Sequence, residues 1–195
     1  MKSLLVSLAT ITLGLTSAIP LMTINVSQNS NSIIKESNEL TMYLKNYDKD
    51  SVRSFYEPER PNASFHYLDI TKRITNTNIK NANISLNKIN FDNRQTEIHT
   101  KYFDSLSKDS VVFESSTLAD PSYWDDKAFY EHTTNLYSDT LWEGVTRYTG
   151  ELAVGLTKNP NTGKIFFVWG VYGHVTLGSN QAVVSAVAKS VVIKY

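Results

Sequence analysis

The residues with the clearest capacity for recognition are aromatic, and most of them lie in the second half of the chain. The protein contains eleven tyrosines and three tryptophans. Aromatic faces stack on sugars and anchor protein interfaces because they bring a large flat surface to the ligand. The same residue types also fill the core of a β-rich protein, and that alternative stays open. The candidate binding residues surround one acidic stretch and are Tyr123, Trp124, Tyr130, Tyr137 and Trp142.

The surroundings of the three tryptophans predict different positions for them. Trp124 and Trp142 each have acidic neighbours, which favour a side chain that faces solvent. Trp169 lies among phenylalanine and valine residues, where a place in the core is expected.

No spacing of residues predicts a metal or cofactor site. The chain has no cysteine, and its four histidines show neither His-x₃-His nor His-Glu-x-x-His spacing. The acidic residues between positions 120 and 131 could gather oxygens around Ca²⁺, but the EF-hand pattern is missing and a helix there would separate them. We therefore expect no bound metal and no cofactor.

No catalytic residues are indicated either. Glu131-His132 with a distant serine would suggest hydrolysis, but the Gly-x-Ser-x-Gly motif of the hydrolase fold is absent. A glycosidase needs a pair of carboxylates, and nothing selects one pair among nineteen acidic residues. An enzyme is the less favoured class, and a hydrolase without a recognisable motif is kept as the second alternative.

The first residues predict export. Lys2 is followed by an apolar run from Leu4 to Leu15, and Thr16-Ser17-Ala18 supplies the small residues at which a signal peptidase would cleave. An uncleaved anchor is the alternative, because the apolar character continues to Ile24 and approaches the roughly 20 residues of a membrane-spanning helix.

The domain organisation follows from this start. We expect a signal peptide over residues 1–18, or up to residue 24, then a flexible polar spacer over residues 25–32. Residues 33–195 suit a single globular β-rich domain that is long enough to bury a core without disulfides.

Charge and cysteine content narrow the class of protein further. The formal net charge is zero, so nothing steers the whole chain to nucleic acid. The absence of cysteine excludes a lipid-modified cysteine and disulfide staples, and it favours a bacterial over a eukaryotic exported protein.

The sequence predicts two helices among the elements that position the aromatic residues. Apolar residues recur at helical intervals from Ile33 to Tyr47. Asp120-Pro121 has the form of an N-cap with proline at the first helical position. A helix over Ser122–Leu136 would align the three candidate tyrosines, which fall seven residues apart, on one face.

Alternation of apolar and polar residues predicts strands between these helices. One covers Phe65–Ile70, and another runs from Ile84 to Phe91 with a one-residue offset that is typical of a β-bulge. Asp92-Asn93 is expected to form the turn into a strand through Ile98–Tyr102, and Ser110–Thr117 continues the β pattern.

The C-terminal third predicts a β-hairpin. Leu152–Thr157 and Lys164–Leu177 have β patterns, and Asn159–Gly163 between them is rich in turn residues. Apolar residues on both faces near Phe166–Trp169 indicate a central strand. Valines favour a strand over a helix in Gln181–Ile193. The fold class is therefore mainly β with one or two short helices (α+β), built as an antiparallel sheet or sandwich with a C-terminal hairpin.

One segment resembles a known family. Residues Ile84 to Thr117 contain LNKINFDNRQTEIHTKYF followed by DSVVFESST, and they resemble the strands that precede the membrane-inserting region of aerolysin-type β-pore-forming toxins. The segment covers about a sixth of the chain and lacks the long Ser/Thr alternation of the inserting hairpins. The resemblance implies a β-pore-forming or membrane-damaging toxin as the alternative function.

The favoured function follows from elimination and from the aromatic residues. We expect a secreted protein, or one displayed on the extracellular face of the membrane, that acts as an adhesin or host-interaction factor. Its partner would be a host-surface protein or glycan, with a membrane as partner only in the toxin alternative.

Overall fold

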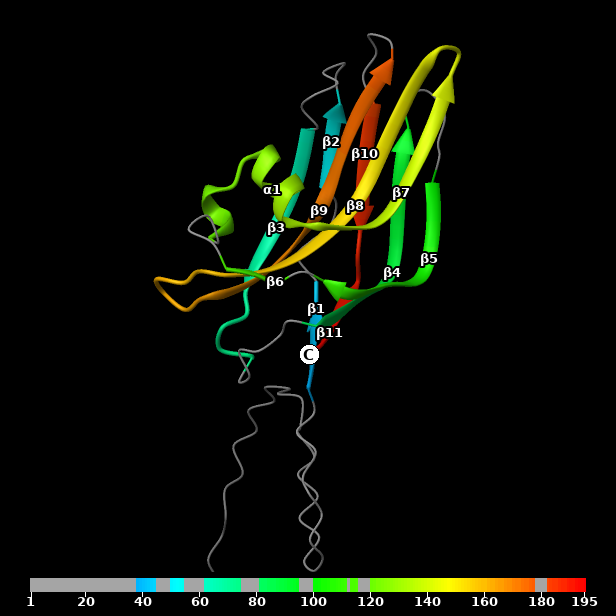
Figure 1. The fold of residues 1–195 in the computed structure, drawn as a ribbon. Coiled ribbons are helices and arrows are strands. Elements are labelled where there is room, and N and C mark those ends of the chain that lie inside the picture. The colour runs from blue at the N-terminus through cyan, green and yellow to red at the C-terminus, as the bar shows by residue number, and fades with distance from the viewer. Residues whose placement is uncertain are drawn as a thin grey trace, which may run out of the picture. The chain divides into compact units, whose positions relative to one another are not determined.

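The computed structural model describes residues 38–44, 50–54, 62–74, 81–94, 100–111, 113–115, 120–177 and 182–195. The signal peptide and the spacer expected before residue 33 lie outside these ranges. Within the described residues, no helix combines the length and the apolar character needed to cross a bilayer. The described residues form two mostly antiparallel β-sheets and one short α-helix, which confirms the predicted fold class (Figure 1).

The first sheet has six strands, of which β4 is the longest. Its order is β1-β11-β4-β10-β2, and β5 pairs with the other side of β4. Strands β10 and β11 follow each other along one edge of β4, so β4 is covered on both edges. The strands are β1 (Glu39–Tyr43), β2 (Asp50–Ser54), β4 (Ala82–Arg94), β5 (Thr100–Val111), β10 (Ala182–Val187) and β11 (Ser190–Lys194).

The second sheet has five strands in the order β3-β9-β8-β6, with β7 on β8. The predicted hairpin is confirmed: β8 and β9 pair antiparallel over the turn at Asn159–Gly163, and β9 lies between β8 and β3. The short β6 is parallel to β8. The strands are β3 (Asn62–Asp69), β6 (Phe113–Ser115), β7 (Thr134–Glu143), β8 (Thr146–Lys158) and β9 (Ile165–Leu177).

The main core contains one face of each sheet. Because side chains alternate along a strand, every second residue of β8 and β9 enters this core. Trp169 is completely buried there, as predicted, together with Phe167 and Leu152 of the same sheet and Phe91 of β4. The opposite face of β8 and β9 packs in one part against a smaller hydrophobic cluster and faces solvent elsewhere.

The predicted N-terminal helix is wrong where the structure describes it, because Glu39–Tyr43 is a strand paired with β11. Leu40, Met42 and Leu44 repeat every second residue, and Met42 and Leu44 are almost completely buried whereas Thr41 and Tyr43 face solvent. This period of two outweighs the weaker helical spacing. The rest of the expected helix lies outside the described residues.

The second predicted helix is much shorter than expected. A 3₁₀ turn η1 (Pro121–Tyr123) precedes α1 (Asp126–His132), and β7 begins at Thr134. Asp120 caps η1 as predicted, and a second cap, Asp125, accepts a hydrogen bond from the Ala128 amide to start α1. Thr133 ends α1 in an extended conformation and donates to the Phe129 carbonyl, so the three tyrosines share no helix face.

Strand β4 differs from the prediction at two points. The buried positions change parity after Leu86, but β4 and β5 keep one register on both sides of Lys88, so no extra residue is inserted there. Lys88 instead adopts a φ of 51°, which rotates the side chains that follow it. Asp92-Asn93 is not a turn, because β4 continues to Arg94 and both residues are buried.

Candidate binding face

The candidate site is the outer face of β7, β8 and β9, which points away from the main core. Helix α1 covers one part of this face, where Phe129 stacks on Phe65 at a centroid distance of 4.8 Å. Beyond α1 the face carries polar and aromatic side chains toward the β7–β8 turn. In Figure 1 this turn and the β8–β9 turn lie at opposite ends of β8.

A hydrogen-bonded network lies beside α1 on this face. Glu151 of β8 is directly opposite Tyr172 of β9 in the antiparallel register. The Tyr172 hydroxyl donates to Glu151 Oε2 at 2.5 Å, and the Asn135 amide donates to the same oxygen. Among the described residues, nothing donates to Glu151 Oε1. The side chain of Glu151 is half-buried, so this second oxygen can accept a hydrogen bond from a ligand.

The ionisation of the neighbouring groups reflects burial and the charge of Glu151. Burial raises the pKa of Tyr172, and the hydrogen bond and negative charge of Glu151 raise it further. Tyr172 therefore remains a hydrogen-bond donor at every physiological pH. Burial lowers the pKa of His174, with Arg147 acting in the same direction and Glu151 against it. The imidazole of His174 is therefore neutral at neutral pH, and it can both donate and accept a hydrogen bond.

Two exposed aromatic side chains flank the network. Tyr130 of α1 is half exposed, and its ring meets the Tyr172 ring edge-on at a centroid distance of 5.1 Å. At the other end of the face Trp142 is 59% exposed, and the Arg147 guanidinium lies 5.7 Å from its ring centroid. Arg147 and Glu151 are four residues apart on β8, which is roughly 13 Å along a strand. Between the two aromatic ends lie the hydroxyls of Thr140 and Thr149, 3.3 Å apart.

The five candidate residues from the sequence do not form one surface. Trp142 and Tyr130 are exposed on the outer face, and Tyr123 is 81% exposed on η1. Trp124 is only 8% exposed, so the prediction of a solvent-facing ring is wrong. Its ring packs against Phe65 and against His132, at centroid distances of 6.2 and 5.4 Å.

Tyr137 lies on the opposite face of the sheet from Trp142. Its ring makes edge-on contacts with Phe91 and Phe103 of the other sheet, and Lys101 lies 5.5 Å from its ring centroid. Tyr137 is therefore a packing residue between the sheets.

Comparisons with known proteins identify no relative. No protein-family model, no curated protein and no solved structure matches the chain. The assignment of a function therefore depends on the residues of this chain alone.

No sequence motif marks the polar residues of this face. Glu151, Tyr172, Asn135 and His174 come from three strands, and no short motif contains them. One signal was present: Glu151 is the only charged residue in the otherwise apolar segment between Gly150 and Thr157. A buried-strand pattern interrupted by one carboxylate indicates that the carboxylate has a partner or a function.

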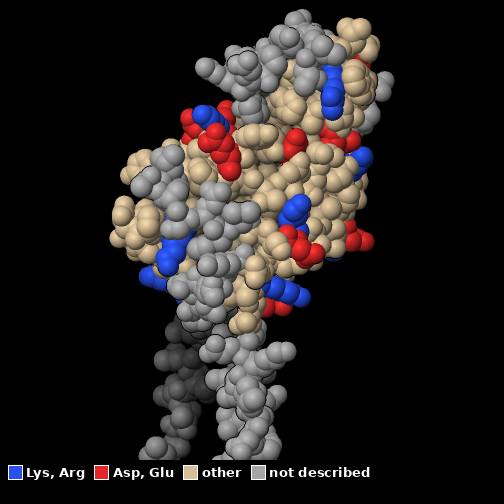
Figure 2. Space-filling view, in the orientation of Figure 1, with Lys and Arg blue, Asp and Glu red and all other residues tan. Residues whose placement is uncertain are grey.

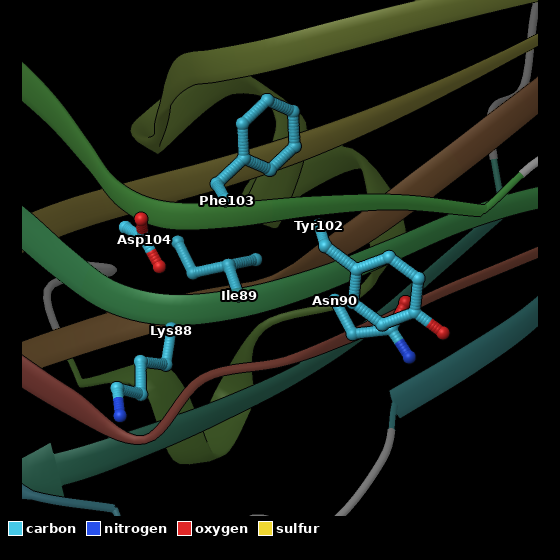
Figure 3. Close-up of a pocket in the computed structure, with 6 residues that line it drawn as sticks. All are labelled: Lys88, Ile89, Asn90, Tyr102, Phe103 and Asp104. Carbon is cyan, nitrogen blue, oxygen red and sulfur yellow. The ribbon is translucent and has the colours of Figure 1, made fainter.

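A hollow of about 370 Å³ lies on the β4–β5 hairpin (Figure 3). Asn90 Oδ1 is buried there and has no hydrogen-bond partner among the described residues, and Tyr102 is 77% exposed. Figure 3 shows these two side chains next to each other. Within the described part of the chain, no group of three histidine or acidic residues could hold a metal ion. The hollow is lined by Lys88, Ile89, Asn90, Tyr102, Phe103 and Asp104.

Proposed function

We propose that the chain is an exported binding protein that recognises a host-surface glycan through the outer face of β7, β8 and β9. The observation that carries the proposal is the half-buried Glu151 carboxylate, which is fixed through one oxygen and leaves the other available between two exposed aromatic side chains. A sugar offers hydroxyl donors for such an oxygen and apolar ring faces for the aromatic side chains.

The spacing of the aromatic residues suits an extended ligand. Tyr130 contacts Tyr172, the residue opposite Glu151, and Trp142 contacts Arg147. Glu151 and Arg147 are roughly 13 Å apart along β8, which is longer than one sugar ring. The side chains between them, including the Thr140 and Thr149 hydroxyls, supply further polar contacts. A polar chain molecule can therefore contact both aromatic ends at once, and a host protein that carries such a chain is the natural partner.

Binding to glycan arrays and to whole host cells tests the proposal. Trp142→Ala and Glu151→Gln should each weaken binding at least tenfold while leaving the far-UV spectrum unchanged. The control is Tyr43→Ala, because Tyr43 is similarly exposed at 69% but lies on β1 of the other sheet. Enzymatic removal of cell-surface glycans should abolish cell binding.

Two outcomes would contradict the proposal. One is equal binding by Trp142→Ala and the wild type. The other is a loss for Tyr43→Ala as large as the loss for Trp142→Ala. Binding that survives removal of the glycans but is lost after protease treatment of the cells would replace the glycan by a protein surface.

The proposal does not extend to membrane insertion or to hydrolysis. The segment that resembles the toxins, β4 and β5, corresponds to strands before the inserting region; its Ile84, Leu86 and Phe91 are completely buried in the main core, so this segment itself offers no inserting hairpin. In the network around Glu151, no second carboxylate from the described residues stands beside the first.

A further inference from the structure

A second, chemically different pocket lies at the far end of the β3-β9-β8 sheet. It has a volume of about 320 Å³ and is lined by Asp69, Thr71, Lys72, Arg73 and Lys164. Ile165, next to Lys164, is nine residues from His174 on β9, which corresponds to roughly 30 Å along the strand. The pocket is therefore separate from the candidate binding face.

The turn after β3 fixes two of the cationic residues. Ile70 and Ile74 are both buried, so the residues between them must project outward. The Ile70 carbonyl accepts hydrogen bonds from the amides of Arg73 and Ile74, at 2.9 and 3.2 Å. Lys72 and Arg73 are thus exposed side chains on a backbone that is anchored at both ends.

The third cation comes from the start of β9, and hydrogen bonds join it to the same turn. The Ile165 amide donates to Thr71 Oγ1 at 2.8 Å, and the Ile70 amide donates to the Ile165 carbonyl at 2.9 Å. On the other side of Lys164, the turn is closed by the Asn159 amide, which donates to the Lys164 carbonyl at 2.8 Å. Two segments that are far apart in sequence therefore hold three cations around one pocket.

The charges in this pocket are not balanced. None of Lys72, Arg73 and Lys164 forms an ion pair with a carboxylate of the described residues. Among the described residues of the pocket lining Asp69 is the one acidic residue. Hydrogen bonds from Thr71 together with the two lysines lower its pKa, so it is ionised. In this described lining, three cations against one carboxylate leave an excess of positive charge. Figure 2 shows blue atoms at the lower left, around the ends of β3 and of the β8–β9 hairpin.

An excess of positive charge gathered at one pocket attracts anions. We propose that this pocket binds a phosphate group, either free or as part of a lipid headgroup. The Arg73 guanidinium can hold two phosphate oxygens with two parallel hydrogen bonds, while Lys72 and Lys164 act as point charges. The volume lies at the small end of the range for ligand pockets, which suits a group of this size. The proposal is independent of glycan binding by the outer face.

The test compares the wild-type chain with two triple variants that have equal net charge. Lys72→Gln/Arg73→Gln/Lys164→Gln removes the pocket cations, and Lys127→Gln/Lys189→Gln/Lys194→Gln removes three exposed lysines elsewhere. Inorganic phosphate is titrated by NMR at constant ionic strength, with chloride as the reference anion. Sedimentation with phosphatidylcholine vesicles, with and without phosphatidylglycerol, tests the lipid source.

For the wild type and the Lys127/Lys189/Lys194 control variant, phosphate should cause saturable NMR chemical-shift changes confined to residues 69–73 and 164. The Lys72/Arg73/Lys164 pocket variant should bind phosphate at least tenfold more weakly. Vesicle binding that depends on phosphatidylglycerol and is lost in the pocket variant, without binding of free phosphate, also supports the pocket and assigns the phosphate to a membrane. Equal behaviour of the two triple variants in both assays would overturn the proposal. If the pocket variant does not fold, Lys164→Gln alone is measured against Lys127→Gln, with the same two outcomes.

Discussion

The hydrogen bond between Tyr172 and Glu151 should contribute measurably to stability, because its donor is buried. Tyr172 is 4% exposed, and its hydroxyl lies 2.5 Å from Glu151 Oε2. A hydrogen bond to a charged group contributes about 1.5–3 kcal/mol to the free energy of unfolding. Glu151 is only half-buried, and the Asn135 amide donates to the same oxygen, so we expect a value of about 1–2 kcal/mol.

A double-mutant cycle isolates this contribution. Tyr172→Phe removes only the hydroxyl, and Glu151→Ala removes the acceptor. Urea unfolding of the wild type, both single variants and the double variant then gives the coupling free energy. Tyrosine absorbance provides a second readout, because the pKa of Tyr172 should fall when the Glu151 charge is removed.

Tyr130 supplies the matched control for the cycle. Its ring contacts Tyr172 at 5.1 Å, but Glu151 accepts its hydrogen bonds from Tyr172 and Asn135. The cycle of Tyr130→Phe with Glu151→Ala should give a coupling below about 0.5 kcal/mol. A coupling between Tyr172 and Glu151 as small as that of the control would refute the proposed network.

Three further predictions concern stability. Trp169→Ala should lower the free energy of unfolding by about 3–5 kcal/mol because the ring is completely buried. Trp142→Ala should lower it by less than about 1 kcal/mol. Similar urea midpoints for the two variants would contradict this prediction. Burial lowers the pKa of His174, so the unfolded chain takes up its proton near pH 6.5 while the folded chain does not. Stability should therefore fall as the pH drops below about 6.5, and the fall should be smaller in His174→Gln when urea midpoints at pH 7.5 and 5.5 are compared. Gly170→Ala should lower the free energy of unfolding by about 1–3 kcal/mol, since the added Cβ would lie 2.3 Å from the Ser64 carbonyl oxygen and push β3 away from β9. An unchanged melting temperature would contradict this prediction, because it would show that β3 can shift without cost.

The C-terminal hairpin was predictable because its turn and both strands have strong local signals. The Asn159 amide and the Lys164 carbonyl close the turn. Counting outward from this pair along both strands places Glu151 opposite Tyr172, which is the register observed. The central contact of the candidate site could therefore have been derived from the predicted hairpin. The contact with Asn135 could not, because the β7–β8 register shifts between Asn135 and Tyr137.

The error at Trp124 has a physical cause. In the sequence the acidic neighbour Asp125 favours a solvent-facing ring, but its carboxylate caps α1 by accepting a hydrogen bond from the Ala128 amide. Capping directs the polar group toward the helix end and leaves the adjacent ring free to pack under the helix, against Phe65. Charge next to an aromatic residue therefore does not determine where the ring points.

The exposed strand β5 has a consequence for how the protein behaves at high concentration. In the described part of the chain β5 pairs with β4 alone, so no described strand pairs with the amides and carbonyls of its outer edge, which another β-strand could join. Edge strands of this kind template aggregation unless charged side chains oppose it. Four charged residues divide the strand into short segments, so a second copy that approaches edge to edge must bring charges together and strip them of water. Replacing these residues with threonine or valine should leave the fold intact and promote fibre formation; they are Lys101, Asp104, Lys108 and Asp109.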